Sequence, residues 1–338
     1  MFHVMPVPPT GHLFARTVEI VSNNSEVREF LKSRRARISP DAAGLQVYGG
    51  LRRVPGLRRE ELAMLSGMSV DYYNRLERGN LTGVSDSILE SLARALKLDD
   101  AERTYLFDLA RAANQKRPRQ RRRGPQKLNP AIQHLLDGMT GIPAFVQNGR
   151  LDVLGMNDLG RALYHPNGDE PEQPQNFARF VFLDNTSQEQ LTDWESTAQD
   201  VVAILRQEAA RDPHNRDLTD LIGELSTHSQ DFRTMWAAQN VRLHRSGTKP
   251  FHHPVIGDFE LTFQALQLPG DDGLTLIAYS AEPGTPGHDA LNLLATWAAT
   301  VRREAGQKAT DMPAKAWSTV RVPPRAERFP ETDGPSWT

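Results

Sequence analysis

The first regular pattern of apolar positions begins at Ser25 and is helical. Val27, Phe30 and Leu31 recur at spacings of three and four residues, which places them on one face of a helix that ends before Pro40. After a loop rich in Gly and Pro, the same periodicity predicts four more short helices, at 57–66, 69–78, 85–96 and 99–113. Five short helices in succession predict an all-α domain over residues 25–114.

The second half of the chain mixes helical periodicity with the alternation typical of strands. Two short apolar runs flank Asn148-Gly149, a dipeptide that favours a two-residue hairpin turn. Helical patterns dominate from 158 to 239, the longest of them at 188–210, and a last helix is expected from His288 to about Arg302. Between these helices the pattern predicts four strands, at 241–245, 251–256, 259–268 and 274–279. We therefore expect an α+β domain over residues 129–303.

Three segments lack any apolar period. Residues 1–24 are rich in Pro at their start and predict a mobile arm, and residues 304–338 are polar and unpatterned, as expected of a disordered tail. Residues 115–128 separate the two predicted domains. They include the string QKRPRQRRRGPQK, which contains no apolar residue, and so predict a basic linker.

The distribution of charge also divides the chain at that linker. Overall, 40 Lys and Arg face 42 Asp and Glu, but residues 26–127 hold 22 basic against 13 acidic residues, and residues 128–338 hold 17 against 28. A basic domain in a nearly neutral chain fits a polyanionic partner, since Lys and Arg that neutralise phosphates release counterions. A solvated charged surface explains the charge equally well, so the motifs must decide.

Composition excludes several classes of protein. The chain has no cysteine, which excludes a disulfide scaffold, a thiol nucleophile and cysteine-ligated zinc. No stretch approaches the roughly 20 apolar residues of a membrane helix and the start lacks a secretory signal, so we expect a cytoplasmic protein with no membrane partner. There is no GxSxG, Walker or dinucleotide motif, and His244, His252 and His253 lack the spacing of a metal site. We expect no catalytic residues, no cofactor and no metal.

Two of the short helices in the first domain meet at a tight turn. Leu62 and Leu65 face inward from the first helix, Gly67 supplies the turn, and Tyr73 and Leu76 face inward from the second helix. This arrangement predicts a helix-turn-helix, in which the outer face of the second helix lies in the major groove of DNA. An ordinary helical hairpin is the alternative.

The string LRREELAMLSGMSVDYYNRLERG resembles the helix-turn-helix of the Xre family of phage-repressor-like regulators. The family's Leu-Ala pair, Gly and closing Leu-Glu-x-Gly match Leu62-Ala63, Gly67 and residues 76–79. Further matches resemble the MmyB-like subgroup of that family. They are Gly56-Leu57-Arg58, Tyr72-Tyr73, Asn157, His253-Pro254, Gly257 and Ala281-Glu282-Pro283. The resemblance implies a multidomain fold, with an all-α five-helix domain followed by an α+β PAS-like domain.

The resemblance also places the family's DNA contacts on this sequence. Arg75 suits a guanine, Asp71 suits cytosine N4 and Val70 suits a thymine methyl, whereas Arg58 and Arg59 suit phosphates. The complete set of expected DNA contacts is Arg58, Arg59, Ser69, Val70, Asp71, Tyr72, Asn74, Arg75 and Arg78. The linker arginines either follow the DNA backbone or enter a minor groove, or are simply solvated. These are Arg117, Arg119, Arg121, Arg122 and Arg123.

For the second domain, the resemblance implies a twisted antiparallel sheet with helices folded over one face, and a sensor of a small apolar molecule with fatty-acid-like ligands as the leading suggestion. The residues themselves show only that aromatic side chains supply a large apolar surface, which either lines a ligand site or packs the core. The expected ligand contacts are Phe180, Trp236, His253 and Phe263. His253 is either a polar anchor for a ligand or a structural hydrogen-bonding residue.

Together these features predict a transcription regulator that binds double-stranded DNA sequence-specifically as a homodimer. Its second domain is expected to bind a small apolar ligand and to contribute to dimerisation. One alternative is a helix-turn-helix regulator whose second domain is a ligand-free dimerisation or protein-interaction module, and another is an enzyme with a DNA-binding head. The opposite charges of the two halves would also allow the acidic domain to fold back on the basic one.

Overall fold

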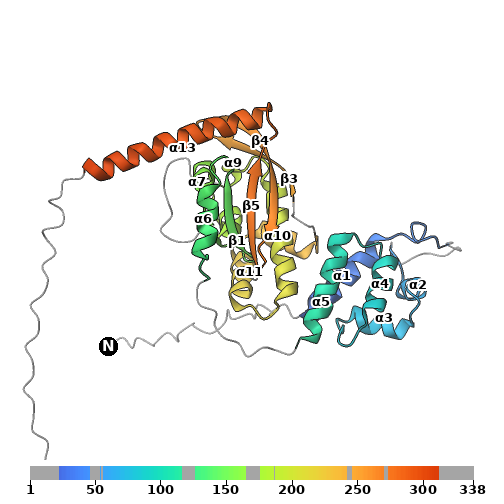
Figure 1. Cartoon of the computed structure of the whole chain (residues 1–338). Coiled ribbons are helices and arrows are strands. Elements are labelled where there is room, and N and C mark those ends of the chain that lie inside the picture. The colour runs from blue at the N-terminus through green and yellow to red at the C-terminus, as the bar shows by residue number, and fades with distance from the viewer. Residues whose placement is uncertain are drawn as a thin grey trace, which may run out of the picture.

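The N-terminal part of the computed structural model consists of helices alone, and the C-terminal part is an antiparallel sheet with helices around it (Figure 1). The structure describes residues 23–45, 54, 56–115, 126–164, 176–185, 187–241, 246–269 and 273–311. Nearly all of the predicted arm, the five linker arginines, and the chain after 311 lie outside these residues. The predicted order of the two domains along the chain, an all-α domain followed by an α+β domain, is confirmed.

Five helices make up the first unit, and each begins and ends within two residues of its predicted bounds. They are α1 (Asn23–Arg37), α2 (Arg59–Leu65), α3 (Val70–Glu77), α4 (Asp86–Ala95) and α5 (Asp100–Asn114). Their apolar faces meet in one core. Phe30, Leu62, Tyr73 and Leu76 are buried there as the spacing predicts, together with Tyr105. The expectation that Leu65 faces inward is wrong, since Leu65 is 36% exposed near the end of α2.

The turn between α2 and α3 has the geometry of a helix-turn-helix. Gly67 adopts a φ of +67°, and the Ser69 hydroxyl caps α3 by accepting a hydrogen bond of 3.2 Å from the Tyr72 N–H. After α3, Gly79 adopts a φ of +100°, and a Cβ placed on it would lie 2.2 Å from the carbonyl oxygen of Asn24. Gly79 therefore lets the end of α3 approach the start of α1.

A buried carboxylate ties α3 to two other parts of the first unit. Glu77, 4% exposed, accepts hydrogen bonds from Nη2 of Arg35 on α1 at 2.9 Å and from Nη2 of Arg59 on α2 at 3.0 Å. Burial alone would raise the pKa of Glu77, but the hydrogen bonds from Arg35 and Arg59 lower it below its usual value. The charged carboxylate thus fixes α3 relative to α1 and α2.

The second unit is built on five antiparallel strands in the order β2-β1-β5-β4-β3. The strands are β1 (Ala144–Asn148), β2 (Val153–Met156), β3 (Ser246–His253), β4 (Gly257–Gln267) and β5 (Leu274–Ser280). A hairpin joins β1 to β2 at the predicted place, but its turn is longer than the expected two residues. Asn148 and Asp152 close it, and Leu151, with a φ of +65°, is its left-handed residue. The predicted strand at 241–245 is wrong at Val241, which lies in no strand and packs in the core of the first unit, and residues 242–245 lie outside the described residues.

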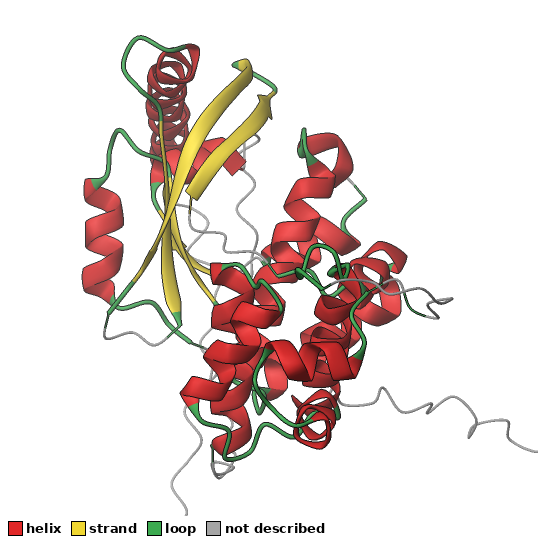
Figure 2. Ribbon diagram, turned by 90° about the vertical axis from the view of Figure 1, so that its right-hand side faces the viewer, coloured by secondary structure: helices red, strands yellow, loops and turns green. Residues whose placement is uncertain are grey.

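Helices cover both faces of the sheet (Figure 2), whereas the resemblance implied helices over one face. α6 (Pro130–Gly138) packs on one face against Val146. α7 (Asp158–Tyr164) and α13 (Pro286–Asp311) pack on the other face, where Phe145 lies. Neighbouring residues of a strand point to opposite sides, and in β1 both Phe145 and Val146 are apolar, so both faces require a cover.

The remaining helices form a layer with a core of its own. They are α8 (Phe177–Leu183), α9 (Ser187–Gln190), α10 (Trp194–Arg211), α11 (Arg216–His228) and α12 (Gln230–Ala237). The single helix predicted at 188–210 is therefore two, separated at residues 191–193. The last helix continues to Asp311 instead of ending near Arg302, so the predicted start of the tail at 304 falls within α13. Residues 302–311 include Arg, Glu, Ala, Gln and Lys, which favour continuation of a helix.

The two units are in contact. α10 lies against α5, and Ala210 of α10 packs in the core of the first unit together with Val241. Figure 1 shows α1 and α5 on the side of the second unit, and α2, α3 and α4 on the side away from it. The acidic unit therefore contacts the basic one without covering α3.

Two glycines of the helix-turn-helix test this geometry. We expect Gly67→Ala to cost about 1 kcal/mol of unfolding free energy, because no atom lies within 4 Å of the added Cβ and the cost comes from a left-handed backbone alone. Gly79→Ala should cost about 3 kcal/mol or more, because strain and a collision with the α1 backbone add together. Urea denaturation of both variants measures the difference, and equal losses would contradict the observed approach of α3 to α1.

The Glu77 network makes a second prediction. Glu77→Gln should cost about 3 kcal/mol at neutral pH, because it leaves Arg35 largely buried without a counter-charge. Since the pKa of Glu77 is lower in the folded state than in the unfolded state, its contribution is present above the unfolded value and is lost as the pH falls through the folded one. The difference between the wild type and the variant should therefore shrink in acid, as followed by denaturation at several pH values.

The matched control is Glu224→Gln in the second unit, where Glu224 pairs with Arg179 at the surface at 2.8 Å. This variant should lose at most about 1 kcal/mol at neutral pH. A loss for Glu77→Gln no larger than that of the control would show that Glu77 does not hold α3 in place.

Candidate functional site

The residues expected to contact DNA belong to α3 and its two caps, Ser69 and Arg78, and to the start of α2. Seven of the nine are exposed, while Tyr72 and Asn74 are half-buried. The exposed ones are Arg58, Arg59, Ser69, Val70, Asp71, Arg75 and Arg78. On the opposite side of α3, Tyr73, Leu76 and Glu77 are buried. The helix thus presents one polar face to solvent from a rigid support.

Contacts within this face orient some of its side chains. The Arg75 guanidinium lies 5.2 Å from the centre of the Tyr72 ring, and its Nη2 donates to the Thr82 carbonyl oxygen at 3.2 Å. Arg59 is held by Glu77, although 56% of its side chain remains exposed. Sequence reasoning missed Met64, an apolar side chain 64% exposed near the turn, which the helical pattern alone does not distinguish from a surface position.

The four expected ligand contacts fall in two different places. Phe263 and His253 belong to the sheet, whereas Phe180 and Trp236 belong to the core of the helical layer. Trp236 stacks on Phe232 with ring centres 5.5 Å apart. The structure therefore does not gather the four residues into one cluster.

His253 is buried and both of its ring nitrogens contact the backbone. Nε2 lies 3.1 Å from the Ala162 carbonyl oxygen, and Nδ1 accepts a hydrogen bond from the Val255 N–H at 3.2 Å. Burial lowers the pKa of His253, partly offset by the contact with Ala162. These contacts favour the structural interpretation of His253 over its use as a polar anchor.

An aromatic cluster lies on the face of the sheet that carries Phe145, which we call the inner face, and it surrounds a pair of tyrosine hydroxyls. Tyr164 of α7 and Tyr279 of β5 approach to 2.6 Å between hydroxyl oxygens, with Phe145 and Phe251 packed against both rings. Burial raises the pKa of Tyr279 to about 12 and that of Tyr164 well above its usual value, so both phenols are neutral. One hydroxyl donates to the other, and within the described residues the second proton has no acceptor.

Lys249 places a charged side chain on the same face of β3 as Phe251. Its Nζ lies 5.4 Å from the centre of the Phe177 ring, between the sheet and α8. Burial lowers the pKa of Lys249, although Asp200 and Asp193 act in the opposite direction. Sequence reasoning missed Lys249; the signal was a lysine at an inward position of an alternating strand.

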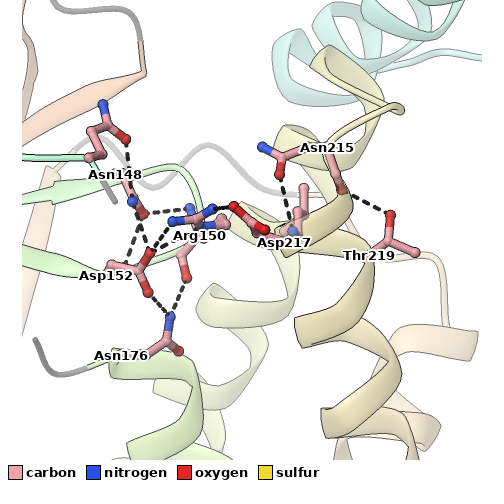
Figure 3. A network of polar contacts seen from close by, with 9 residues as sticks. Asn148, Arg150, Asp152, Asn176, Asn215, Asp217 and Thr219 are labelled. Carbon is pink, nitrogen blue, oxygen red and sulfur yellow. Dashed lines mark hydrogen bonds and ion pairs between the residues drawn. The ribbon is translucent and has the colours of Figure 1, made fainter. Parts of the chain in front are cut away.

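A polar network joins the β1–β2 hairpin to the helical layer (Figure 3). Asp152 accepts hydrogen bonds from Nη2 of Arg150 at 2.7 Å and from Nδ2 of Asn176, the N-cap of α8, at 2.7 Å. Arg150 also pairs with Asp217 of α11 at 2.5 Å. Burial would raise the pKa of Asp152, but its hydrogen bonds, including one from Asn148, lower it. Because each charge in the network is paired, its geometry suits a structural clamp between the hairpin, α8 and α11.

Two further searches of the described ranges gave no site. No group of three or more His, Asp or Glu side chains among them is arranged to hold a metal ion. No helix in those ranges has the length and apolar character needed to cross a membrane.

Comparison with known families places both units. Residues 26–106 match a helix-turn-helix domain model, and residues 128–294 match the model of the MmyB-like transcription regulator ligand binding domain. No curated protein matches the chain. These matches cover the same stretches as the helical unit with its exposed α3 and the sheet unit with its aromatic inner face. The chain belongs to the MmyB-like helix-turn-helix transcription regulators, with a DNA-binding domain followed by a ligand-binding domain.

Proposed function

We propose that this regulator binds a specific double-stranded DNA site as a homodimer, with α3 in the major groove. The observation that carries the proposal is the exposed polar face of α3, held in place from behind by buried Glu77. Arg75 suits the bidentate pairing of a guanidinium with guanine. Arg58, which is exposed before the start of α2, suits a phosphate. Two copies related by a two-fold axis would read the two halves of a palindromic site.

We further propose that the second unit binds a small apolar molecule in contact with the inner face of the sheet. The aromatic side chains around Tyr164 and Tyr279 supply apolar surface, and their unused hydroxyl proton supplies one hydrogen-bond donor. We group Phe263 with this site, whereas Phe180 and Trp236 pack in the core of the helical layer. Lipids such as fatty acids have the matching chemistry.

A second candidate function is supported by exposed leucines. Leu135 of α6 is 68% exposed and Leu293 of α13 is 60% exposed. Such positions suit a dimerisation or protein-interaction module that needs no ligand. Both matched families are families of regulators, so we propose no reaction. The proposed domains are residues 25–114 and 129–303, with α13 extending the second to Asp311.

Substitutions of two arginines distinguish reading of bases from contact with phosphates. Arg75→Ala should relax the base preference at one position of the site, at a cost of about 1–3 kcal/mol. Arg58→Ala should weaken binding to all sequences alike and reduce the slope of log affinity against log salt by about 1. Selection from random duplexes followed by binding titrations at several salt concentrations measures both effects. An unchanged preferred sequence for Arg75→Ala would refute the proposed register of α3.

Mass spectrometry of the purified full chain tests the ligand. Native spectra and organic extraction should reveal about one apolar molecule bound to each chain. Tyr164→Phe combined with Tyr279→Phe should weaken its binding about fivefold, because the hydrogen bond of about 1 kcal/mol from the pair to the ligand is lost while the apolar surface remains. A clean, dimeric chain that takes up none of a panel of lipids added at millimolar concentration would favour the ligand-free module.

A further inference from the structure

The contact between the two units contains a buried arginine from each of them. Arg206 of α10 is 0% exposed, and its Nη1 lies 2.6 Å from Oε2 of Glu26 on α1. The same nitrogen donates to Oε1 of Gln239 at 2.8 Å. The Arg206 guanidinium also lies 4.2 Å from the ring centre of Trp236 and donates to the Trp236 carbonyl oxygen. A charge of the ligand-binding domain is therefore neutralised by the DNA-binding domain.

The second arginine makes the reciprocal contact. Arg34 of α1 is 2% exposed, and its Nη2 donates to the Gln239 carbonyl oxygen at 2.6 Å. Its Nε lies 2.8 Å from Oε1 of Glu102 on α5. Gln239 thus receives Arg206 on its side chain and Arg34 on its backbone. We call Glu26, Arg34, Arg206 and Gln239 the interdomain latch.

Gln239 itself is held in an unusual conformation. It follows the C-cap of α12 with a φ of +56°, in the left-handed region that favours glycine at this position of a helix end. A glutamine there costs free energy, and two hydrogen bonds offset that cost, one from Arg34 of the DNA-binding domain and one from Arg206 of its own domain. If α12 ended differently, Gln239 would leave this conformation and both arginines would lose a partner together.

One hydrogen-bond donor of the latch has no acceptor, and the latch is in contact with the interior of the ligand-binding domain. Within the described residues, Nε of Arg206 is buried without a hydrogen-bond acceptor. Trp236, one turn before Gln239, stacks on Phe232, which meets the edge of Phe182 at 5.1 Å. A change in the packing of this aromatic core therefore reaches the latch through one short helix.

We propose that the interdomain latch is a two-state device, which when closed fixes the DNA-binding domain relative to the ligand-binding domain and when open weakens operator binding. This inference rests on the proposed function, because a dimer bound to two half-sites needs its two α3 helices at a fixed separation. The closed latch engages α1 and α5 and leaves α3 free on the other side, so it orients the DNA-reading helix without blocking it (Figure 1).

The claim that the latch fixes one domain relative to the other is tested by measuring the distance between two labels, one in each domain. The chain has no cysteine, so Ser87→Cys on α4 and Thr227→Cys on α11 accept one spin label each. Pulsed electron paramagnetic resonance on labelled chains diluted with unlabelled chains then reports distances within one chain. The latch variant is Glu26→Gln with Arg206→Met, which removes both charges and leaves neither one buried alone.

A milder variant and a matched control accompany it. Gln239→Gly keeps the left-handed backbone and the carbonyl acceptor for Arg34. It removes the side-chain contacts with Arg206 and, at 3.5 Å, with Oε2 of Glu26 across the domain contact. This variant tests the latch if the double variant fails to fold. The control is Arg179→Met with Glu224→Gln, which removes an ion pair inside the ligand-binding domain. The latch variants should broaden the distance distribution, and the control should leave it narrow.

The functional part uses the duplex that the wild-type chain selects from random DNA. Both latch variants should raise the concentration for half-saturation of this duplex about fivefold or more, and the control should not change it. An unchanged distance distribution, or a broadened one with unchanged DNA binding, overturns the proposal. If the wild type selects no sequence, the proposed function fails, while the distance measurement still shows whether the latch holds the domains together.

Discussion

Buried carboxylates paired with arginines are the constraint on which the arrangement of this chain depends. Glu77 joins three elements of the DNA-binding domain, and Glu26 joins that domain to the ligand-binding domain through Arg206. Such pairs contribute little net stability, because desolvation of the charges cancels most of their attraction. Leaving one partner alone is costly, however, so they exclude other packings of the same helices. The pairs therefore specify geometry more than they add stability.

In the helix-turn-helix, this constraint means that the buried face of α3 holds the helix in place, while the exposed face is the one that we propose recognises DNA. Helix α3 has eight residues, too few to be stable alone in water. Tyr73, Leu76 and Glu77 bind its inner face to the rest of the domain, whereas its outer face is exposed and makes few contacts, such as the hydrogen bond from Arg75 to the Thr82 carbonyl oxygen. Side chains such as Asp71 and Arg75 can therefore differ between relatives without loss of the fold.

The sequence predicted what depends on local periodicity and missed what depends on distant partners. Spacing correctly placed Tyr73 and Leu76 inside and identified all five helices. Arg34 follows Phe30 and Leu31 at the same helical spacing, but nothing local identifies Gln239 as its partner. Val241 looked like the start of a strand because it is β-branched, yet it packs against another domain. The four expected ligand contacts lie in two different clusters for a related reason. Aromatic residues pack both the sheet face and the core of the helical layer, and the sequence does not distinguish these two environments.

The place of contact between the domains limits how a ligand can act on DNA binding. Because the ligand-binding domain touches α1 and α5 and α3 lies beyond them, it does not cover the face of α3 that we propose reads DNA (Figure 1). Within one chain, the remaining route for an effect on DNA binding is the orientation of one domain relative to the other. A ligand changes that orientation only if it binds one arrangement better than the other. Helix α12 connects the two places that such a ligand would link. Phe232 near its start belongs to the interior of the ligand-binding domain, and Gln239, just beyond its end, belongs to the contact between the domains.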